Sequence, residues 1–351
     1  MLSEKKSIQQ TPSLTKDRDC LFDNIRCILI FLTVFAHMFS PISKQAEAVQ
    51  ILYKFIFLFH MPAFILISGY FSKNADKCRK TAVSKFLIPY LVLNLISSVI
   101  YLYKHDLAWY KLNLFYPRWG MWFLLILFVY RFLLSDLLKV RFMLPLAFLI
   151  GILSGCFDAL GESFGLGRLF AFLPFFMLGV YLTPEHIEKI RRIPKWIPLL
   201  LIFASFGFIL FVHFNHKLDW TPYLNFSHGV LFMRNSYHSC NLTFTQGILA
   251  RGFSYLFALS MTFSLIALMP RKSCYLSYIG RNTLPVYALH LFVLPYIKAL
   301  KVFGGYGWDY AIFSAVIAIA LTQLFSSKPV ANAYNWVQNK IELLLFRSES
   351  D

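Results

Sequence analysis

The sequence predicts an all-α polytopic membrane protein, a bundle of about ten transmembrane helices with both termini in the cytoplasm. Of its 351 residues, 58% are hydrophobic and 15% are charged, whereas soluble domains are nearer half apolar and a quarter charged. The net charge of +17 arises from basic residues in short segments between apolar stretches, as in cytoplasmic loops. We therefore expect membrane lipid as a partner and no nucleic acid.

The predicted spans follow from the apolar stretches, since a helix needs about 20 mainly apolar residues to cross a membrane. They cover residues 21–42, 49–71, 84–103, 121–138, 142–157, 168–183, 196–213, 249–269, 283–301 and 309–327. Glycine and proline interrupt the fifth and sixth, which are also short. With the N-terminus placed inside, most of the 34 basic residues fall on the cytoplasmic side. We therefore divide the chain into a cytoplasmic tail (1–20), a transmembrane domain (21–330) and a second cytoplasmic tail (331–351).

The first predicted span carries a polar stripe. Arg26 and His37 are 11 positions apart, which at about 100° per residue is close to three full turns, so both side chains project from one face. Asp23 falls on the same side, where it is expected to orient Arg26. An ionisable group at membrane depth costs at least a few kcal/mol, so it usually faces a cavity with a function. The stripe therefore predicts a polar site inside the bundle.

Three histidines lie away from the ends of the predicted spans: His37, His60 and His290. Histidine transfers protons near neutral pH, but a buried histidine is often a hydrogen-bonded packing residue. In lipid each polar ring needs a partner or water. We assign catalytic roles to His37, His60 and His290, together with Arg26.

Three arginines are placed at outer helix ends, against the topology bias: Arg118, Arg168 and Arg251. Each either extends its side chain to the lipid headgroups or lines an outward-facing pocket and binds a polar or anionic substrate through its planar fork. The outer connection 214–248 carries His216, Trp220, Tyr223, His228, Arg234 and His238. It is either a sugar-binding loop or a solvated connector with interfacial aromatic residues.

A dense basic segment on the inner side runs from Lys73 to Lys85. It sets the topology and attracts anionic lipid, or it attracts a phosphate-rich cofactor. The six cysteines form no CxxC pair and no metal-ligand spacing, so we expect no metal. Cys156 and Cys240, both predicted near the outer face, are either packing residues or a disulfide pair. The sequence has no Gly-rich phosphate loop, HExxH zinc motif or GxSxG elbow.

Several of these residues form an ordered set of motifs. They are the Arg26-x10-His37 pair, Phe59-His60-Met61-Pro62 through Ser68-Gly69-Tyr70, Trp122-Phe123-Leu124 through Arg131, Arg168 through Pro174-Phe175-Phe176 to Gly179, and Gly280-Arg281-Asn282-Thr283-Leu284 with Tyr287 and His290. From about residue 18 to 330 the chain resembles the integral-membrane acyltransferase family 3, and within it the fucose 4-O-acetylase-like branch. The resemblance implies a ten-helix bundle of the bacterial cytoplasmic membrane.

The resemblance also implies a reaction: transfer of an acetyl group from acetyl-CoA to a hydroxyl of a surface or exported carbohydrate. Arg26 and His37 are then essential; Arg26, Arg281 and Lys85 face the donor phosphates. Arg168, Arg118, Arg251 and Trp122 are the expected acceptor-binding residues. His37 acts as general base or transiently carries the acetyl group. The alternatives are a transporter or flippase and a polysaccharide polymerase; the acceptor sugar and the oligomeric state stay open.

Overall fold

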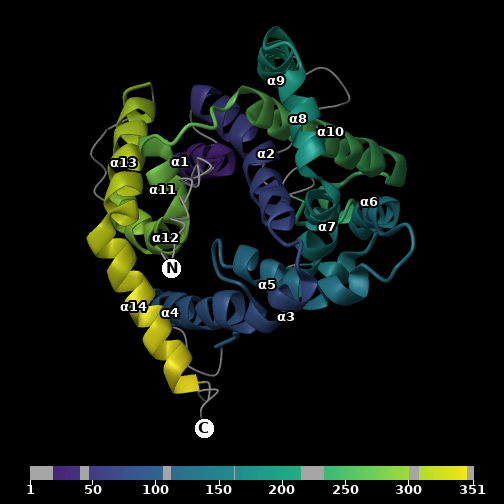
Figure 1. The fold of residues 1–351 in the computed structure, drawn as a ribbon. Helices are drawn as coiled ribbons and strands as arrows, with labels where there is room; N and C mark the ends of the chain where they lie inside the picture. The colour runs from purple at the N-terminus through teal and green to yellow at the C-terminus, as the bar shows by residue number, and fades with distance from the viewer. Residues whose placement is uncertain are drawn as a thin grey trace, which may run out of the picture.

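The protein is helical throughout the part of the chain that the computed structural model describes, residues 19–39, 47–105, 112–161, 163–214, 233–299 and 308–345 (Figure 1). The helices are α1 (Leu21–Phe39), α2 (Glu47–Tyr70), α3 (Ala75–Ala82), α4 (Ile88–Lys104), α5 (Trp122–Leu137), α6 (Met143–Leu153), α7 (Leu166–Tyr181), α8 (Pro184–Arg192), α9 (Trp196–Phe214), α10 (Phe244–Leu268), α11 (Tyr275–Arg281), α12 (Thr283–Ala299), α13 (Trp308–Ser326) and α14 (Lys328–Leu345). This confirms the predicted all-α fold class.

Each of the ten predicted spans coincides with a helix, but their lengths differ. Within the described residues, five helical segments are long and apolar enough to cross a membrane by length and composition: Leu21–Phe39, Val49–Tyr70, Ala75–Lys104, Phe244–Leu268 and Asp309–Ser326. A sixth arises if α7 and α8, which are bent by 96° at the break between them, count as one span. At about 1.5 Å per residue, α6 and other shorter apolar helices fall below the thickness of a bilayer. The count of ten stays a prediction, as does the orientation of the termini.

Helix α1 lies between two apolar cores, which explains how one helix carries both packing and polar residues. Leu21, Ile25 and Leu29 belong to a core shared with α2, α5, α7 and α10. Ile30 and Val34 belong to another, shared with α4, α5, α12 and α13. Burying these two flanks leaves the stripe with Arg26 and His37 partly exposed. The hydrophobic pattern of α1 therefore fixes which way its polar residues face.

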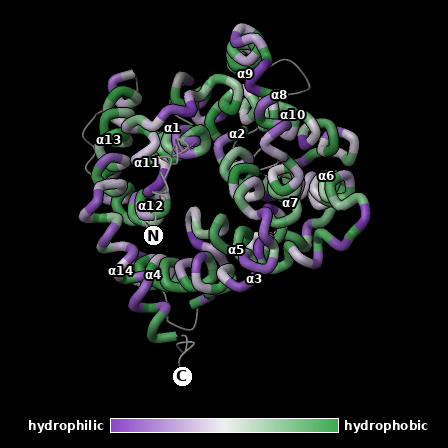
Figure 2. The backbone as a smooth tube through the Cα atoms, viewed as in Figure 1, coloured by the Kyte–Doolittle hydropathy of each residue, from purple (hydrophilic) through white to green (hydrophobic). Residues whose placement is uncertain are grey.

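Four helices were not among the predicted spans because they are short or polar: α3, α8, α11 and α14. Helix α8 begins with a well-formed N-cap. The side chain of Thr183 accepts a hydrogen bond from the backbone N–H of His186, and Pro184 occupies the first turn. Helix α14 occupies most of the predicted C-terminal tail. It runs past α4 on the outside of the helical ring in Figure 1, and its stretches of hydrophilic and hydrophobic residues alternate in Figure 2.

Basic residues near the predicted cytoplasmic end hold the carbonyl ends of helices, which have no intrahelical donors. The Lys73 ammonium donates to the carbonyl oxygens of Gly179, Val180 and Leu182 at the end of α7. Arg191 donates to the carbonyls of Ile266 and Met269 at the end of α10, at 2.8 and 2.7 Å. Lys73, which belongs to the basic segment expected to set the topology or attract a cofactor, thus stabilises the fold itself.

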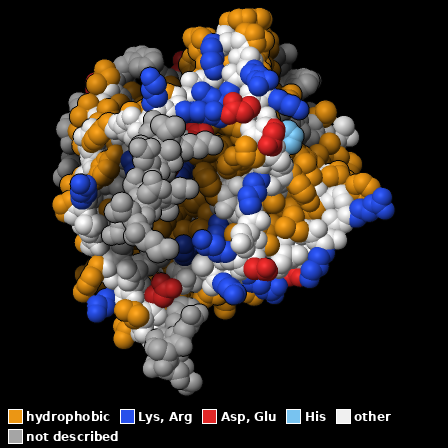
Figure 3. All heavy atoms as spheres, in the orientation of Figure 1, with side chains coloured by type: hydrophobic (Ala, Val, Ile, Leu, Met, Phe, Trp, Pro, Cys, Tyr) orange, Lys and Arg blue, Asp and Glu red, His pale blue; other side chains and the backbone are white. Residues whose placement is uncertain are grey.

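The face viewed in Figure 3 is hollowed between α2, α5 and α12. Hydrophobic side chains line the hollow, and Lys and Arg side chains lie around its rim. The same face carries α8 and α11, which follow the predicted inner ends of α7 and α10. An apolar recess with a basic rim therefore opens at the end of the bundle from which α1 starts.

Candidate active site

His37 of α1 and His290 of α12 form a pair deep in the bundle. Their rings are stacked, with centroids 5.1 Å apart and planes inclined by 17°, and His37 Nδ1 lies 2.9 Å from His290 Nε2. His290 is fully buried, whereas His37 is partly exposed. The structure therefore joins two predicted catalytic residues and leaves one of them accessible.

The hydrogen bonds assign the protons of this pair. His290 Nδ1 lies 2.8 Å from the carbonyl oxygen of Val286, and because a carbonyl only accepts, this nitrogen carries the proton. In neutral His290, Nε2 then accepts a hydrogen bond from His37 Nδ1–H. The remaining nitrogen of neutral His37, Nε2, consequently carries the lone pair. His290 thus sets His37 in the tautomer that can accept a proton.

His60 is separate from this pair. It is 1% exposed, its Nδ1 lies 2.8 Å from the carbonyl oxygen of Ile56, and its ring packs edge-on against Phe57 at 4.9 Å. Phe57 in turn contacts His37 at 5.9 Å. Through Phe57, these contacts place His60 one ring away from His37.

Arg26 lies one turn into α1, at the opposite end of the polar stripe. Its guanidinium pairs with the carboxylate of Asp23, donates to the carbonyl of Phe22 at 3.3 Å and lies 5.5 Å from the ring centre of Phe71. Asp23 is 3% and Arg26 28% exposed. The expected orientation of Arg26 by Asp23 is confirmed.

Arg281 is brought to the same end of α1 by close backbone packing. A Cβ atom on Gly280 would lie 1.7 Å from the carbonyl oxygen of Asp23, so only glycine allows α11 to approach α1 this closely. Arg281 follows directly and is exposed. Lys85 is also exposed, in the π-helical turn Val83–Leu87 between α3 and α4. Arg26 and Arg281 therefore share one end of the site.

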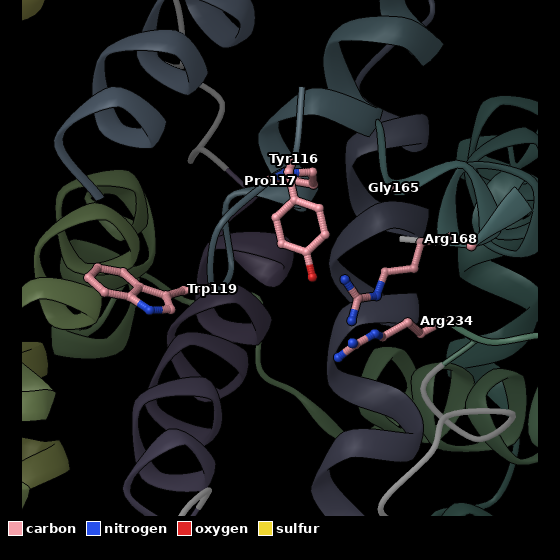
Figure 4. Close-up of a pocket in the computed structure, with 7 residues that line it drawn as sticks. Tyr116, Pro117, Trp119, Gly165, Arg168 and Arg234 are labelled. Carbon is pink, nitrogen blue, oxygen red and sulfur yellow. The ribbon is translucent and has the colours of Figure 1, made fainter. Parts of the chain in front are cut away.

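A small pocket of about 140 Å³ lies near the start of α7. It is lined by Tyr116, Pro117, Trp119, Gly161, Gly165, Arg168 and Arg234. The guanidinium groups of Arg168 and Arg234 lie beside each other, with the hydroxyl of Tyr116 directed toward them (Figure 4). Arg168 also stacks over the ring of Trp122 at 4.5 Å. Two predicted substrate-binding residues, Arg168 and Trp122, are thus brought together.

Arg234 completes this pocket, although its position within the long outer connection was its only signal in the sequence. A Cβ on Gly167 would lie 2.5 Å from the carbonyl oxygen of Arg234, so the Arg234 backbone rests on the first turn of α7. Burial lowers the pKa of Arg234 from its usual value. His216, Trp220, Tyr223 and His228 lie outside the described residues.

A polar latch holds the segment that carries Arg234. We use this name for Asp158, Ser236 and His238. The carboxylate of Asp158 accepts a hydrogen bond from the Ser236 hydroxyl and lies 3.0 Å from His238 Nδ1. Next to the latch, the backbone N–H of Tyr237 donates to the carbonyl of Gly155 at 2.6 Å. These bonds fasten the end of the outer connection to the segment between α6 and α7.

The other two predicted substrate-binding arginines are not among the residues that line the pocket. Arg251 is 1% exposed and donates to the carbonyl of Gly151 at 3.1 Å. Arg118 lies 3.9 Å from the ring centre of Tyr101, and its backbone N–H donates to the side-chain oxygen of Asn94 at 2.8 Å. Arg251 therefore holds the carbonyl end of α6, and Arg118 fastens the segment before α5 to α4.

An aromatic wall connects the pocket with the histidine pair. Trp122 contacts Phe123 at 6.3 Å, Phe123 contacts Tyr287 at 5.5 Å, and Tyr287 contacts His290 at 6.2 Å between ring centres. Arg168 lies within electrostatic reach of the Tyr287 hydroxyl. The arginine pocket and the histidines are therefore parts of one region.

No group of three His, Cys, Asp or Glu side chains among the described residues is placed to hold a metal ion. Cys156 and Cys240 pack in the same small apolar cluster and are present as thiols.

Comparison with known proteins identifies the family. The family described as "Acyltransferase domain", the acyltransferase 3 type, matches residues 21–327. The chain belongs to acyltransferase family 3. A stretch of 67 residues is 39% identical to nodulation protein NolL of Mesorhizobium japonicum, and this stretch covers 18% of either protein. No solved structure matches the chain.

The family match describes an acyltransferase domain that covers most of the chain. The protein is an integral membrane protein with this domain, since the match includes all five described helices that are long and apolar enough to cross a membrane. The transporter and polymerase alternatives lose their support, because the family match covers the segments that contain the polar stripe, the histidine pair and the arginine pocket.

Proposed function

We propose that this acyltransferase moves an acetyl group from acetyl-CoA to a hydroxyl of a cell-surface or exported carbohydrate, in the bacterial cytoplasmic membrane. The single observation that carries the proposal is the hydrogen bond between His37 and His290 at 2.9 Å. It places the lone pair of neutral His37 on Nε2, and the His37 ring is half-buried. Such a nitrogen is suited to accept the proton of an alcohol during acyl transfer.

His37 acts as the general base in this scheme. Its Nε2 accepts the proton of the acceptor hydroxyl while the hydroxyl oxygen attacks the acyl carbon, and it then gives that proton to the departing sulfur. One C–S bond breaks, one C–O bond forms, and His37 ends neutral as it began. His290 accepts a hydrogen bond from His37 Nδ1–H throughout, so it stabilises the imidazolium form that exists between the two proton transfers.

The donor fits the end of the site at which Arg26 and Arg281 lie. Acetyl-CoA is a substrate with several phosphate charges, and guanidinium groups bind phosphate oxygens in a planar, bidentate way. Arg26 and His37 lie on one face of α1 about 16 Å apart, at 1.5 Å per residue. The basic rim and apolar recess of Figure 3 suit a charged nucleotide outside and an extended thioester arm inside.

The acceptor is proposed to enter from the opposite end, through the region of Arg168, Arg234 and Trp122. The arginine and tyrosine side chains of this region supply hydrogen bonds to sugar hydroxyls. Donor and acceptor then approach His37 from two sides. This arrangement keeps the coenzyme on the cytoplasmic side while the product remains on the outer side.

The proposal is tested with the full-length protein in nanodiscs. We expect release of the CoA thiol from acetyl-CoA and an acetyl ester on the carbohydrate, detected by mass spectrometry. His37→Ala should abolish both, whereas His105→Ala, an exposed histidine at the end of α4, should retain them. Surface glycans of cells with and without the gene should differ by one acetyl group. Unchanged turnover in His37→Ala would remove the catalytic assignment.

A further inference from the structure

We infer that Asn24 is a positioning residue for the acyl donor. It fastens the segment between α10 and α11 to α1, and thereby holds Arg281 at the end of the site where Arg26 lies. This inference rests on the proposed function, in which both arginines bind the phosphates of acetyl-CoA. Helix α11, which ends at Arg281, lies beside α1 in Figure 1. Asn24 lies near the start of α1 and is fully buried.

The Asn24 amide is bonded on both sides to the segment that joins α10 to α11 and to the first turn of α11. Its Nδ2 donates to the carbonyl oxygens of Pro270, at 2.8 Å, and Lys272, at 3.2 Å. Its Oδ1 accepts a hydrogen bond from the Ser277 hydroxyl at 2.6 Å and one from the Cys274 thiol at 3.4 Å. An amide has two N–H donors and one oxygen with two lone pairs. All of its hydrogen-bonding capacity is therefore used on this one part of the chain.

The same network reaches the side chain of Arg281. Ser277, whose hydroxyl bonds to Asn24, accepts a hydrogen bond from Arg281 Nε on its backbone carbonyl at 3.1 Å. The Ser277 hydroxyl also accepts the backbone N–H of Cys274 at 3.0 Å, and Ser277 is fully buried. A guanidinium whose Nε is bonded to a fixed carbonyl presents its terminal nitrogens in a defined plane. Asn24 therefore orients Arg281 through Ser277.

Arg271 supplies the other side-chain contacts of this segment. Its guanidinium pairs with Asp19, at 3.2 Å, and with Glu188. Both carboxylate side chains are about half exposed, and such surface ion pairs contribute little because water and salt screen them. The Asn24 amide is buried, and its removal takes the donor from two carbonyl groups. Asn24 is therefore the stronger of the two side-chain fastenings.

The role of Asn24 is tested by CoA binding to the full-length protein in nanodiscs, measured by calorimetry without an acceptor. Asn24→Ala and Arg281→Gln should each weaken CoA binding by about tenfold or more, as expected for the loss of charge-assisted hydrogen bonds. Because Asn24 acts through Arg281, the double variant should bind CoA no more weakly than Arg281→Gln alone. In Asn24→Ala the KM for acetyl-CoA should rise while kcat changes little.

A matched control is Asn94→Ala in α4. Asn94 is also fully buried, and its Nδ2 donates to the carbonyls of Leu114, at 3.0 Å, and Tyr116, at 3.3 Å. Its side-chain oxygen accepts the backbone N–H of Arg118 at 2.8 Å. This variant removes an equivalent buried amide, so its unfolding temperature should fall as it does for Asn24→Ala. Its affinity for CoA should stay that of the wild type.

Ser277→Ala keeps the test available if Asn24→Ala does not fold. It removes a single hydrogen bond to Asn24, so CoA binding should weaken by a smaller factor, and the effect should vanish when Arg281→Gln is also present. Three results overturn the inference: wild-type CoA binding in the Asn24→Ala or Ser277→Ala protein that folds, additive losses in the double variant, or an equal loss in Asn94→Ala.

The same measurements separate the two proposals. If the wild type binds CoA and transfers acetyl groups while Asn24→Ala binds CoA equally tightly, the proposed function stands and the role of Asn24 is removed. CoA binding that depends on Asn24 and Arg281 without any acetyl transfer would keep the positioning role and remove the reaction. A wild-type protein that does not bind CoA would remove both.

Discussion

His37 Nδ1 lies 2.9 Å from His290 Nε2, although the two residues are 253 positions apart in the sequence. His290 is held in place by its hydrogen bond to the carbonyl of Val286. It can therefore orient His37, which is the proton acceptor of the pair. The first prediction concerns the supporting ring. His290→Ala should lower kcat by roughly 10- to 100-fold, within the range for disturbed general-base catalysis, with little change in the KM for acetyl-CoA.

Rescue separates a positioning role from a structural one. In His290→Gln the side-chain oxygen can accept the hydrogen bond from His37 Nδ1, so part of the lost kcat should return. Thermal unfolding is measured in parallel for both variants. Equal kcat values for His290→Ala and wild type would contradict the role assigned to His290.

The second prediction concerns the ion pair of Asp23 and Arg26. Asp23→Asn removes the buried carboxylate, so Arg26 loses its orientation and the KM for acetyl-CoA should rise. Breaking a fully buried ion pair lowers the free energy of unfolding by about 3–5 kcal/mol. Because Arg26 is partly exposed, we expect Asp23→Asn to lower the free energy of unfolding by roughly 1–2 kcal/mol. Asp76→Asn, an exposed aspartate in the first turn of α3, is the matched control. An unchanged KM would show that Arg26 does not contact the donor.

The third prediction concerns the contact of α11 with α1. In Gly280→Ala the new methyl group would meet the Asp23 carbonyl oxygen at 1.7 Å, so the two helices must separate, and both the unfolding temperature and the activity should fall. Gly207→Ala in α9 meets no atom within 4 Å and should stabilise its helix by up to about 1 kcal/mol. A Gly280→Ala protein as stable and active as Gly207→Ala would refute this packing.

The fourth prediction concerns the pH dependence of the latch. The Ser236 hydroxyl, and then His238, lower the pKa of Asp158 below its usual value. A lowered carboxyl pKa stabilises the folded latch above the usual pKa of about 4, and this stabilisation is lost as the pH falls through the lower folded value. The protection factors of residues 233–243, which are hydrogen-exchange rates corrected for the intrinsic effect of pH, should therefore fall in acid.

A neutral substitution should reproduce this state without acid. Asp158→Asn should show the faster exchange already at pH 7, whereas Asp136→Asn, an exposed aspartate in α5, should not. If exchange in residues 233–243 is the same for Asp158→Asn and wild type at pH 7, the latch does not hold this segment.

The sequence predicted the apolar helices well, because in lipid a long run of hydrophobic residues can pair its backbone N–H and C=O groups in few ways other than a helix. The exposure of Arg26 and His37 on one face followed from helical periodicity alone. The pairing of Arg26 with Asp23 followed as well, since both residues lie within one turn. Short-range relations along one helix were therefore accessible before the fold was known.

Relations between distant segments were not accessible in this way. Nothing near His290 in the sequence indicates that α12 places it against His37, and His60 has an equally suggestive position in α2. Arg251 resembles Arg168 in its place at an outer helix end, yet its guanidinium bonds to the carbonyl of Gly151. Deciding which buried polar groups serve the site requires knowing which carbonyls need donors, and that depends on tertiary packing.

The hydrogen bonds of Lys73 and Arg191 to the ends of α7 and α10 give these side chains one role during membrane insertion and another in the folded protein. During insertion their positive charge opposes translocation and so helps orient the chain; after assembly their N–H groups occupy carbonyls that would otherwise lack donors. Many basic residues share the first task, but each carbonyl cluster depends on its own partner. Lys73→Met would therefore leave the orientation of the chain in the membrane unchanged and still loosen the packing of α7 against α2.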